Sequence, residues 1–158
     1  MLVVVKPEPI NKTFPQANDI YKLIKFVDEK TFNFHEQNLK RIKLEYVKRQ
    51  YSYYKSAANY LGLLKDEKPT DLALSIFKLG KNEVLINIVN LVIEKRIFYN
   101  YYEYRDIERV KSYLMELYKL SYSTATRRAS TVKAWVYWCD HIIKENKLTI
   151  EIADSFIY

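Results

Sequence analysis

The stretch of residues 121–139, SYSTATRRASTVKAWVYWC, constrains the fold of this chain more than any other. Its apolar residues recur at steps of three and four, which predicts a helix with one buried face. We expect Ser123 to cap this helix, because a serine hydroxyl can accept a hydrogen bond from an unpaired N–H of the first turn. Small polar and cationic residues lie largely off the apolar face: Thr124, Arg127, Arg128, Ser130, Thr131 and Lys133. Such residues at the start of a helix suit a phosphate or a base edge.

The same arrangement occurs once earlier in the chain. The sixteen residues from Arg49 are RQYSYYKSAANYLGLL, and those from Arg127 are RRASTVKAWVYWCDHI. Their superposed polar residues are Arg49 with Arg127, Ser52 with Ser130 and Lys55 with Lys133. Duplication of a structural unit produces such a match, and chance similarity is the alternative explanation.

The first half of the chain has the element order of a winged helix. With only 2 Gly and 4 Pro in 158 residues, tight turns are few, which favours helices over a sandwich or barrel. Apolar spacing predicts helices near residues 19–29, 35–43 and 47–60. We expect Gly62 to adopt a left-handed backbone conformation just after the third of these helices. Two short apolar segments, 61–64 and 72–74, flank a charged turn and predict a hairpin. This order is that of a winged helix-turn-helix unit.

The second half repeats this order. We predict helices at 83–98, 106–119 and 121–139, a connector at 98–102, and a second hairpin over 141–152. The lead-in holds three of the four prolines and is expected to be extended, with an edge strand at residues 2–5. The predicted fold is therefore mainly α with small β-hairpin wings, a tandem winged helix-turn-helix. Its parts are an extended lead-in at 1–16, a first unit at 17–79 and a second unit at 80–158.

The charge of the chain favours a polyanionic partner. The formal net charge is +7 and the pI is about 9.3, and nucleic acid is the commonest polyanion for a small basic domain. An AT-rich genome is the alternative explanation, because it enriches Lys, Tyr, Ile and Asn together. Cys139 is the sole cysteine, which fits a reducing cytosol. No apolar run reaches the length of about 18–20 residues that spans a bilayer. We expect a cytoplasmic, nucleoid-associated prokaryotic protein that does not contact a membrane.

Two motifs resemble a tandem winged-helix domain that occurs beside or fused to prokaryotic restriction endonucleases. The motifs are RQ-x-x-YY-x-x-A-x-x-LGLL and TATRRAST-x-K-x-W-x-x-W, and the resemblance covers residues 17–145. The residues that carry it are Arg49, Gln50, Tyr53, Tyr54, Ala57, Leu61 and Gly62 in the first half, and Ser123, Thr124, Thr126, Arg127, Arg128, Thr131 and Trp135 in the second. One departure is Leu74-Ser75 with Gly80, where the family has a Leu-Thr step before its glycine. The resemblance implies sequence-specific recognition of double-stranded DNA, with nuclease chemistry on a separate domain or subunit.

The predicted DNA-binding residues lie on the two repeated helices. They are Lys48, Arg49, Gln50, Ser52, Tyr53 and Lys55 on the first, and Thr124, Thr126, Arg127, Arg128, Ser130, Thr131 and Lys133 on the second. One arginine fork can bind guanine while its neighbour binds a phosphate. The alternative is a solvated face, or ion pairs between these arginines and the acidic residues Glu103, Asp106 or Glu108. We expect Trp135 and Trp138 in the core.

We predict no catalytic residue, metal, cofactor or small-molecule ligand for this chain. The one Glu-x-Lys motif, Glu145 to Lys147, follows Asp140 by only five residues, which is too close for a magnesium nuclease site. Adjacent Cys139, Asp140 and His141 have poor spacing for zinc. The expected function is target recognition for a type II restriction endonuclease system. The alternatives are a dimeric winged-helix transcriptional regulator and a helical protein-interaction module.

Overall fold

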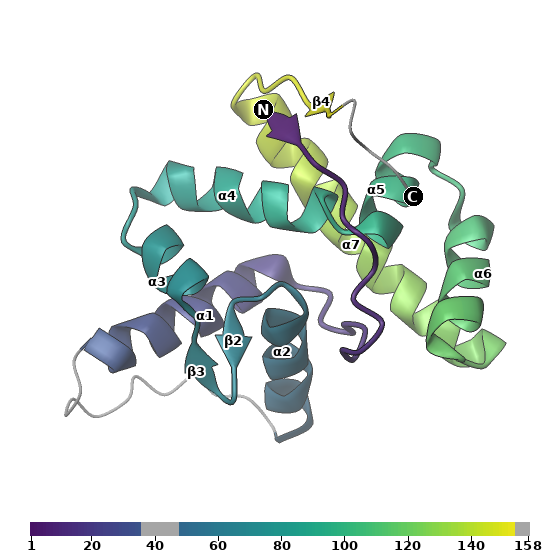
Figure 1. Ribbon diagram of the computed structural model, residues 1–158, viewed down its shortest axis with the longest axis horizontal. Helices are drawn as coiled ribbons and strands as arrows, with labels where there is room; N and C mark the ends of the chain where they lie inside the picture. The colour runs from purple at the N-terminus through teal and green to yellow at the C-terminus, as the bar shows by residue number, and fades with distance from the viewer. Residues whose placement is uncertain (36–47, 154–158) are drawn as a thin grey trace.

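The computed structural model describes residues 1–35 and 48–153 and is mainly helical (Figure 1). Two short two-stranded sheets accompany the helices in this described part of the chain. In chain order the elements are β1 (Leu2–Val3), α1 (Ile20–His35), α2 (Lys48–Tyr60), β2 (Leu64–Lys65), β3 (Lys68–Pro69), α3 (Asp71–Phe77), α4 (Lys81–Ile93), α5 (Arg96–Tyr104), α6 (Ile107–Tyr118), α7 (Tyr122–Glu145) and β4 (Glu151–Ile152). The predicted mainly α class is confirmed. The helix predicted at 35–43 lies outside the described residues, apart from its first position.

The longest helix, α7, packs against helices from both halves of the chain. It contacts α1, α4, α5 and α6, and Figure 1 shows it beside α6 and crossing the end of α4. Trp135 is fully buried on its inner face and stacks on Phe98 of α5, with ring centroids 5.0 Å apart. The predicted apolar face is confirmed. The predicted cap is wrong, because the hydroxyl of Ser121, not of Ser123, accepts the backbone N–H of Thr124.

Helix α2 ends at the glycine that the sequence indicates. Gly62 has a φ of +78°, in the left-handed region. The backbone N–H of Leu63 bonds back to the Ala58 carbonyl at 2.9 Å, and that of Gly62 bonds back to Asn59 at 3.0 Å. These two bonds satisfy carbonyls that the end of the helix would otherwise leave unpaired.

A hairpin follows α2, as predicted, but it is shorter than predicted. Strand β2 pairs with β3 in antiparallel fashion, and the turn residues Asp66 and Glu67 both have positive φ. Two such residues suit a two-residue hairpin turn, so the chain reverses immediately after β2. The strand predicted at 72–74 is wrong: these residues belong to α3. The Thr70 hydroxyl caps α3 by accepting the Ala73 N–H at 3.2 Å.

The helix predicted at 83–98 is two helices, α4 and α5. Residues 98–102, predicted as a connector, lie inside α5. A residue from the lead-in explains where α5 begins, because Oε2 of Glu8 accepts the backbone N–H of Ile97 at 3.1 Å. This carboxylate satisfies one of the N–H groups that the first turn of a helix leaves free.

The hairpin predicted over 141–152 is wrong. Residues up to Glu145 continue α7, and β4 pairs in parallel with β1, so that Leu2 lies beside Glu151 and Val3 beside Ile152. The strand predicted at residues 2–5 is thereby confirmed over its first two positions. The strand partner of β4 comes from the opposite end of the chain, and a hairpin pattern cannot reveal such a partner.

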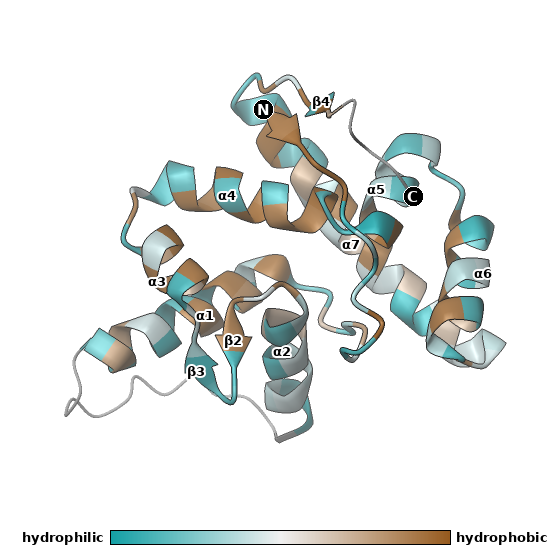
Figure 2. Ribbon diagram, in the orientation of Figure 1, coloured by the Kyte–Doolittle hydropathy of each residue, from teal (hydrophilic) through white to brown (hydrophobic). Residues whose placement is uncertain are grey.

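The buried apolar residues form one cluster that draws on α1 and α2 as well as on α4 to α7. Figure 2 shows hydrophobic residues on the sides of α1 and α4 that face each other. The proposed division into units at 17–79 and 80–158 stays a prediction.

Candidate nucleic-acid interface

Helices α2 and α7 have similar exposure at most superposed positions, although Tyr53 is partly exposed and its counterpart Thr131 is buried. The exposed or partly exposed pairs are Arg49 with Arg127, Ser52 with Ser130 and Lys55 with Lys133. The buried pairs are Tyr54 with Val132, Ala57 with Trp135, Ala58 with Val136, Tyr60 with Trp138 and Leu61 with Cys139. The two helices therefore present equivalent polar faces to solvent and equivalent apolar faces to the core.

Residues 14–19, which run from the end of the lead-in to the start of α1, lie between α2 and α7 and contact both. On the α7 side, the Trp135 indole N–H donates to the Ala17 carbonyl at 2.7 Å, and the Thr131 hydroxyl donates to the Asn18 side chain at 2.5 Å. On the α2 side, the Phe14 ring meets the Tyr60 ring edge-on, with centroids 5.3 Å apart. One extended segment thus separates the two helices (Figure 1).

Side chains of the two helices approach each other across this segment. The Arg49 Nε donates to the Tyr53 hydroxyl at 2.7 Å. Burial, and then the charge of Arg127, lower the pKa of Arg128, while the electrostatic influence of Tyr53 from α2 raises it. Tyr53 of α2 and Arg128 of α7 are therefore close enough to interact electrostatically.

The predicted residues of α7 divide into exposed and inward-facing groups. Arg127 is exposed and its guanidinium bonds the Thr124 hydroxyl at 3.3 Å, while Ser130 and Lys133 are also exposed. Thr131 is fully buried, which corrects its assignment to the polar face. Thr131 faces inward because its hydroxyl donates a hydrogen bond to the side-chain oxygen of Asn18.

Arg128 also faces inward, unlike Arg127. Its Nη1 donates to the Phe14 carbonyl, and its Nε is buried without a hydrogen-bond partner among the described residues. Neither arginine forms an ion pair within residues 1–35 and 48–153. The proposed pairing with Glu108 does not occur, since Glu108 binds Lys111 at 3.0 Å. Thr126 is partly buried, and its hydroxyl donates to the backbone carbonyl of residue 122.

The predicted residues of α2 start with Lys48, the first residue of the helix. Arg49, Gln50 and Ser52 are exposed, and Tyr53 is partly exposed beneath the Arg49 guanidinium. Lys55 forms an exposed ion pair at 3.3 Å with Glu67 in the hairpin turn. This pair ties the polar face of α2 to the hairpin.

A groove between α5 and α7 contains residues that the sequence prediction missed. Its volume is about 460 Å³, and its lining residues are Tyr101, Arg105, Ser130, Lys133, Ala134 and Tyr137. Arg105 makes a two-bond ion pair with Asp140, at 2.7 and 2.9 Å, and lies over the Tyr102 ring. The signal for Tyr137 was available in the sequence, because it continues the spacing of Ser130 and Lys133 by one further turn.

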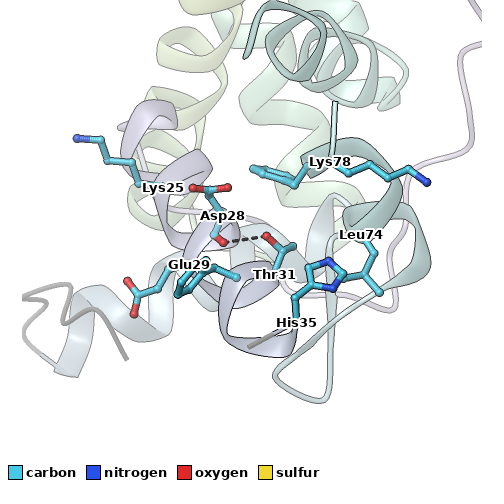
Figure 3. A pocket seen from close by; sticks show the side chains of 9 residues that line it. Lys25, Asp28, Glu29, Thr31, His35, Leu74 and Lys78 are labelled. Carbon is cyan, nitrogen blue, oxygen red and sulfur yellow. Dashed lines mark hydrogen bonds between the residues drawn. The ribbon is translucent and has the colours of Figure 1, made fainter. Parts of the chain in front are cut away.

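A second pocket, of about 410 Å³, lies between α1 and α3 (Figure 3). It is lined by Lys25, Asp28, Glu29, Thr31, Phe32, His35, Leu74, Phe77 and Lys78. Burial raises the pKa of the Asp28 carboxyl, and the Thr31 hydroxyl donates to the Asp28 backbone carbonyl at 2.8 Å. This pocket holds none of the predicted DNA-binding residues.

Two further properties concern the described residues alone. In that part of the chain, no three His, Cys, Asp or Glu side chains are grouped so that they could hold a metal ion. None of the described helices combines the length and apolar character needed to cross a membrane.

Comparison with known proteins identifies a family. No curated protein and no solved structure is significantly similar to the chain. A family model described as a domain of unknown function, DUF7226, matches residues 19–144, from the residue before α1 to the last turn of α7. Because this match covers most of the chain, the protein belongs to the DUF7226 family.

Proposed function

We propose that this protein binds double-stranded DNA sequence-specifically through the exposed sides of α2 and α7. One observation carries the proposal: the two helices present an arginine, a serine and a lysine at three superposed positions that are exposed or partly exposed, on either side of residues 14–19. A cationic surface with two equivalent helices suits a long, regular polyanion better than a small ligand.

The chemistry of the exposed residues supports DNA contacts. Arg127 and Arg49 can each bind the O6 and N7 acceptors of guanine, and Gln50 can pair with adenine. Ser52 can supply a hydroxyl donor to phosphate. Ser130 can do so by turning its hydroxyl away from the Thr126 carbonyl, to which it donates at 3.3 Å. Arg128 acts mainly as a structural residue that joins α7 to Phe14. We assign base contacts on α7 to Arg127 rather than to Arg128.

The arrangement of α1, α2 and the β2–β3 hairpin supports a winged-helix origin for the first half. In such domains the helix before the hairpin enters the major groove. In the second half, α7 is the counterpart of α2. The strand that follows it, β4, pairs with β1 instead of forming a hairpin. The proposed unit therefore has two DNA-contacting helices and one hairpin.

The biological role is proposed from the resemblance to domains beside restriction endonucleases. In this role the chain selects the target site for a type II restriction endonuclease system, and a partner nuclease domain or subunit cuts. Two contacting helices on one chain can bind adjacent segments of a short, non-palindromic site, each adding to the affinity of the other. A palindromic footprint from a symmetric dimer would instead favour a transcriptional regulator.

Selection from a random duplex library, followed by sequencing and a fluorescence anisotropy titration over a salt series, tests the proposal. We expect one enriched sequence and an affinity that falls steeply with salt, by about 0.9 log units per log salt for each phosphate contact. Arg49→Ala and Arg127→Ala should each weaken binding to the enriched site. Lys81→Ala, an exposed residue of α4, is the control for loss of one charge. Absence of duplex binding at low salt would overturn the proposal and favour a protein-interaction module.

A further inference from the structure

We propose that the α5–α7 groove binds the sugar-phosphate backbone of one DNA strand, next to the bases that Arg127 contacts. This inference rests on the proposed DNA-binding function and extends it to residues outside the repeated motifs. The new residue is Tyr137, which acts together with Lys133 and Ser130.

The exposed residues of α7 form a line that is long enough to run from a base to the backbone. Arg127, Ser130, Lys133 and Tyr137 follow one another at steps of three and four, and all four are exposed. Ten residues of α-helix span about 15 Å, whereas the major groove is about 12 Å wide. If Arg127 lies at a base edge and α7 runs across the groove, Tyr137 lies at the wall of the groove, where the phosphates are.

The groove offers hydrogen-bond donors that suit phosphate. Lys133 is exposed and has no ion pair or hydrogen bond among the described residues. Tyr137 is 78% exposed, more than any other large hydrophobic side chain in the described part of the chain. Lysine, serine and tyrosine side chains are all common donors to phosphate oxygens, and the Ser130 hydroxyl would exchange the Thr126 carbonyl, its present acceptor at 3.3 Å, for a phosphate oxygen.

The side of the groove formed by α5 is nearly neutral. Arg105 is held by both carboxylate oxygens of Asp140 and lies over the rings of Tyr101 and Tyr102, with its guanidinium 5.8 and 5.4 Å from their centroids. Its charge is compensated by Asp140, so the uncompensated charge in the groove is that of Lys133. One uncompensated cation and the hydroxyls of Ser130 and Tyr137 in an open groove are a weak site for a free ion. They are well suited to a phosphate that neighbouring contacts already hold in place.

Four single variants of the full chain test this inference: Lys133→Ala, Tyr137→Phe, Tyr137→Ala and Arg127→Ala. We expect Lys133→Ala and Tyr137→Phe each to weaken binding by about threefold to tenfold, equally for the enriched site and for unrelated duplexes. Lys133→Ala should also reduce the salt slope by about 0.9. Arg127→Ala should act mainly on the enriched site. Lys144→Ala removes the same charge from the same helix about 16 Å beyond Lys133 and should leave affinity within twofold.

Each contrary result has a distinct meaning. If Arg127→Ala weakens binding while Lys133→Ala and Tyr137→Phe behave like the unaltered chain, the groove inference is wrong and the proposed function stands. A second contrary result combines three observations: Tyr137→Phe binds duplex DNA normally, Tyr137→Ala does not, and the unaltered chain binds single-stranded DNA as tightly as duplex. The Tyr137 ring then stacks on bases, and the assignment of the groove to the backbone is overturned. If the unaltered chain binds no duplex at low salt, the proposed function fails and the groove inference fails with it.

Discussion

The Tyr118 hydroxyl donates a hydrogen bond to Oε1 of Glu8 at 3.0 Å, although the two residues are 110 positions apart. The same oxygen accepts the Tyr60 hydroxyl, and the other oxygen accepts the Ile97 N–H. One carboxylate from the lead-in thus joins the end of α2, the start of α5 and the end of α6. Lys95 is also nearby and interacts electrostatically with this carboxylate.

Loss of the Glu8 carboxylate should destabilise the whole fold. Glu8→Ala leaves the buried Tyr60 hydroxyl and the Ile97 N–H without their acceptor, and each unsatisfied group costs about 1–3 kcal/mol. The partly buried Tyr118 hydroxyl keeps a second acceptor, the Pro9 carbonyl at 3.1 Å. We expect the free energy of unfolding to fall by about 3 kcal/mol in total, because water can reach part of the cavity. Urea denaturation followed by circular dichroism measures the change. Glu116→Ala, at an exposed position of α6, is the control and should change stability by less than about 0.5 kcal/mol.

The same carboxylate should make stability depend on pH in a direction opposite to that of most acidic residues. Burial raises the pKa of Glu8 above its ordinary value of 4.5, despite the hydrogen bonds from Tyr60, Ile97 and Tyr118 that lower it. The folded state then binds the proton more tightly than the unfolded state, so this stabilisation is present below about pH 4.5 and is lost as the pH rises through the folded pKa. We expect the unfolding free energy of the native chain, minus that of Glu8→Gln, to decrease with pH above 4.5. A difference that increases with pH would show that the pKa is lowered instead.

Of the two adjacent arginines of α7, we expect Arg128 to contribute mainly to stability and Arg127 mainly to DNA binding. Arg128 is partly buried and donates to the Phe14 carbonyl, so Arg128→Ala should lower the free energy of unfolding by about 1–2 kcal/mol. Arg127 is exposed, and Arg127→Ala should change stability by less than about 0.5 kcal/mol. For DNA binding the order reverses: loss of the Arg127 fork should cost about 1–3 kcal/mol at the preferred site. Equal effects of the two variants in both assays would contradict this division.

Trp135 and Tyr137 allow the buried and exposed faces of α7 to be compared for their contributions to stability. Trp135 is fully buried, stacks on Phe98 and bonds the Ala17 carbonyl, so Trp135→Ala should destabilise the fold by about 3–5 kcal/mol. Tyr137→Ala should leave thermal stability nearly unchanged, because its side chain lies mostly in solvent. A large loss of stability in Tyr137→Ala would show that its ring supports the fold, and its effect on DNA binding could then not be assigned to a direct contact.

The sequence by itself determined the elements whose signals are local. The apolar spacing of α2, α6 and α7, the left-handed Gly62 and the charged hairpin turn each depend on residues a few positions apart. Helical periodicity and turn chemistry act over that same short range, which is why these elements were predicted. The burial of Trp135 and Trp138 followed from the same spacing.

Only the tertiary structure decided the features that depend on the residues before α1. Glu8 starts α5 from 89 positions away, and Asn18 and Phe14 turn Thr131 and Arg128 inward from 113 and 114 positions away. The strand β4 pairs with β1 from the opposite end of the chain. The residues concerned have no periodic or motif relationship to one another in the sequence, so their partners become evident only when the fold brings them within hydrogen-bonding distance.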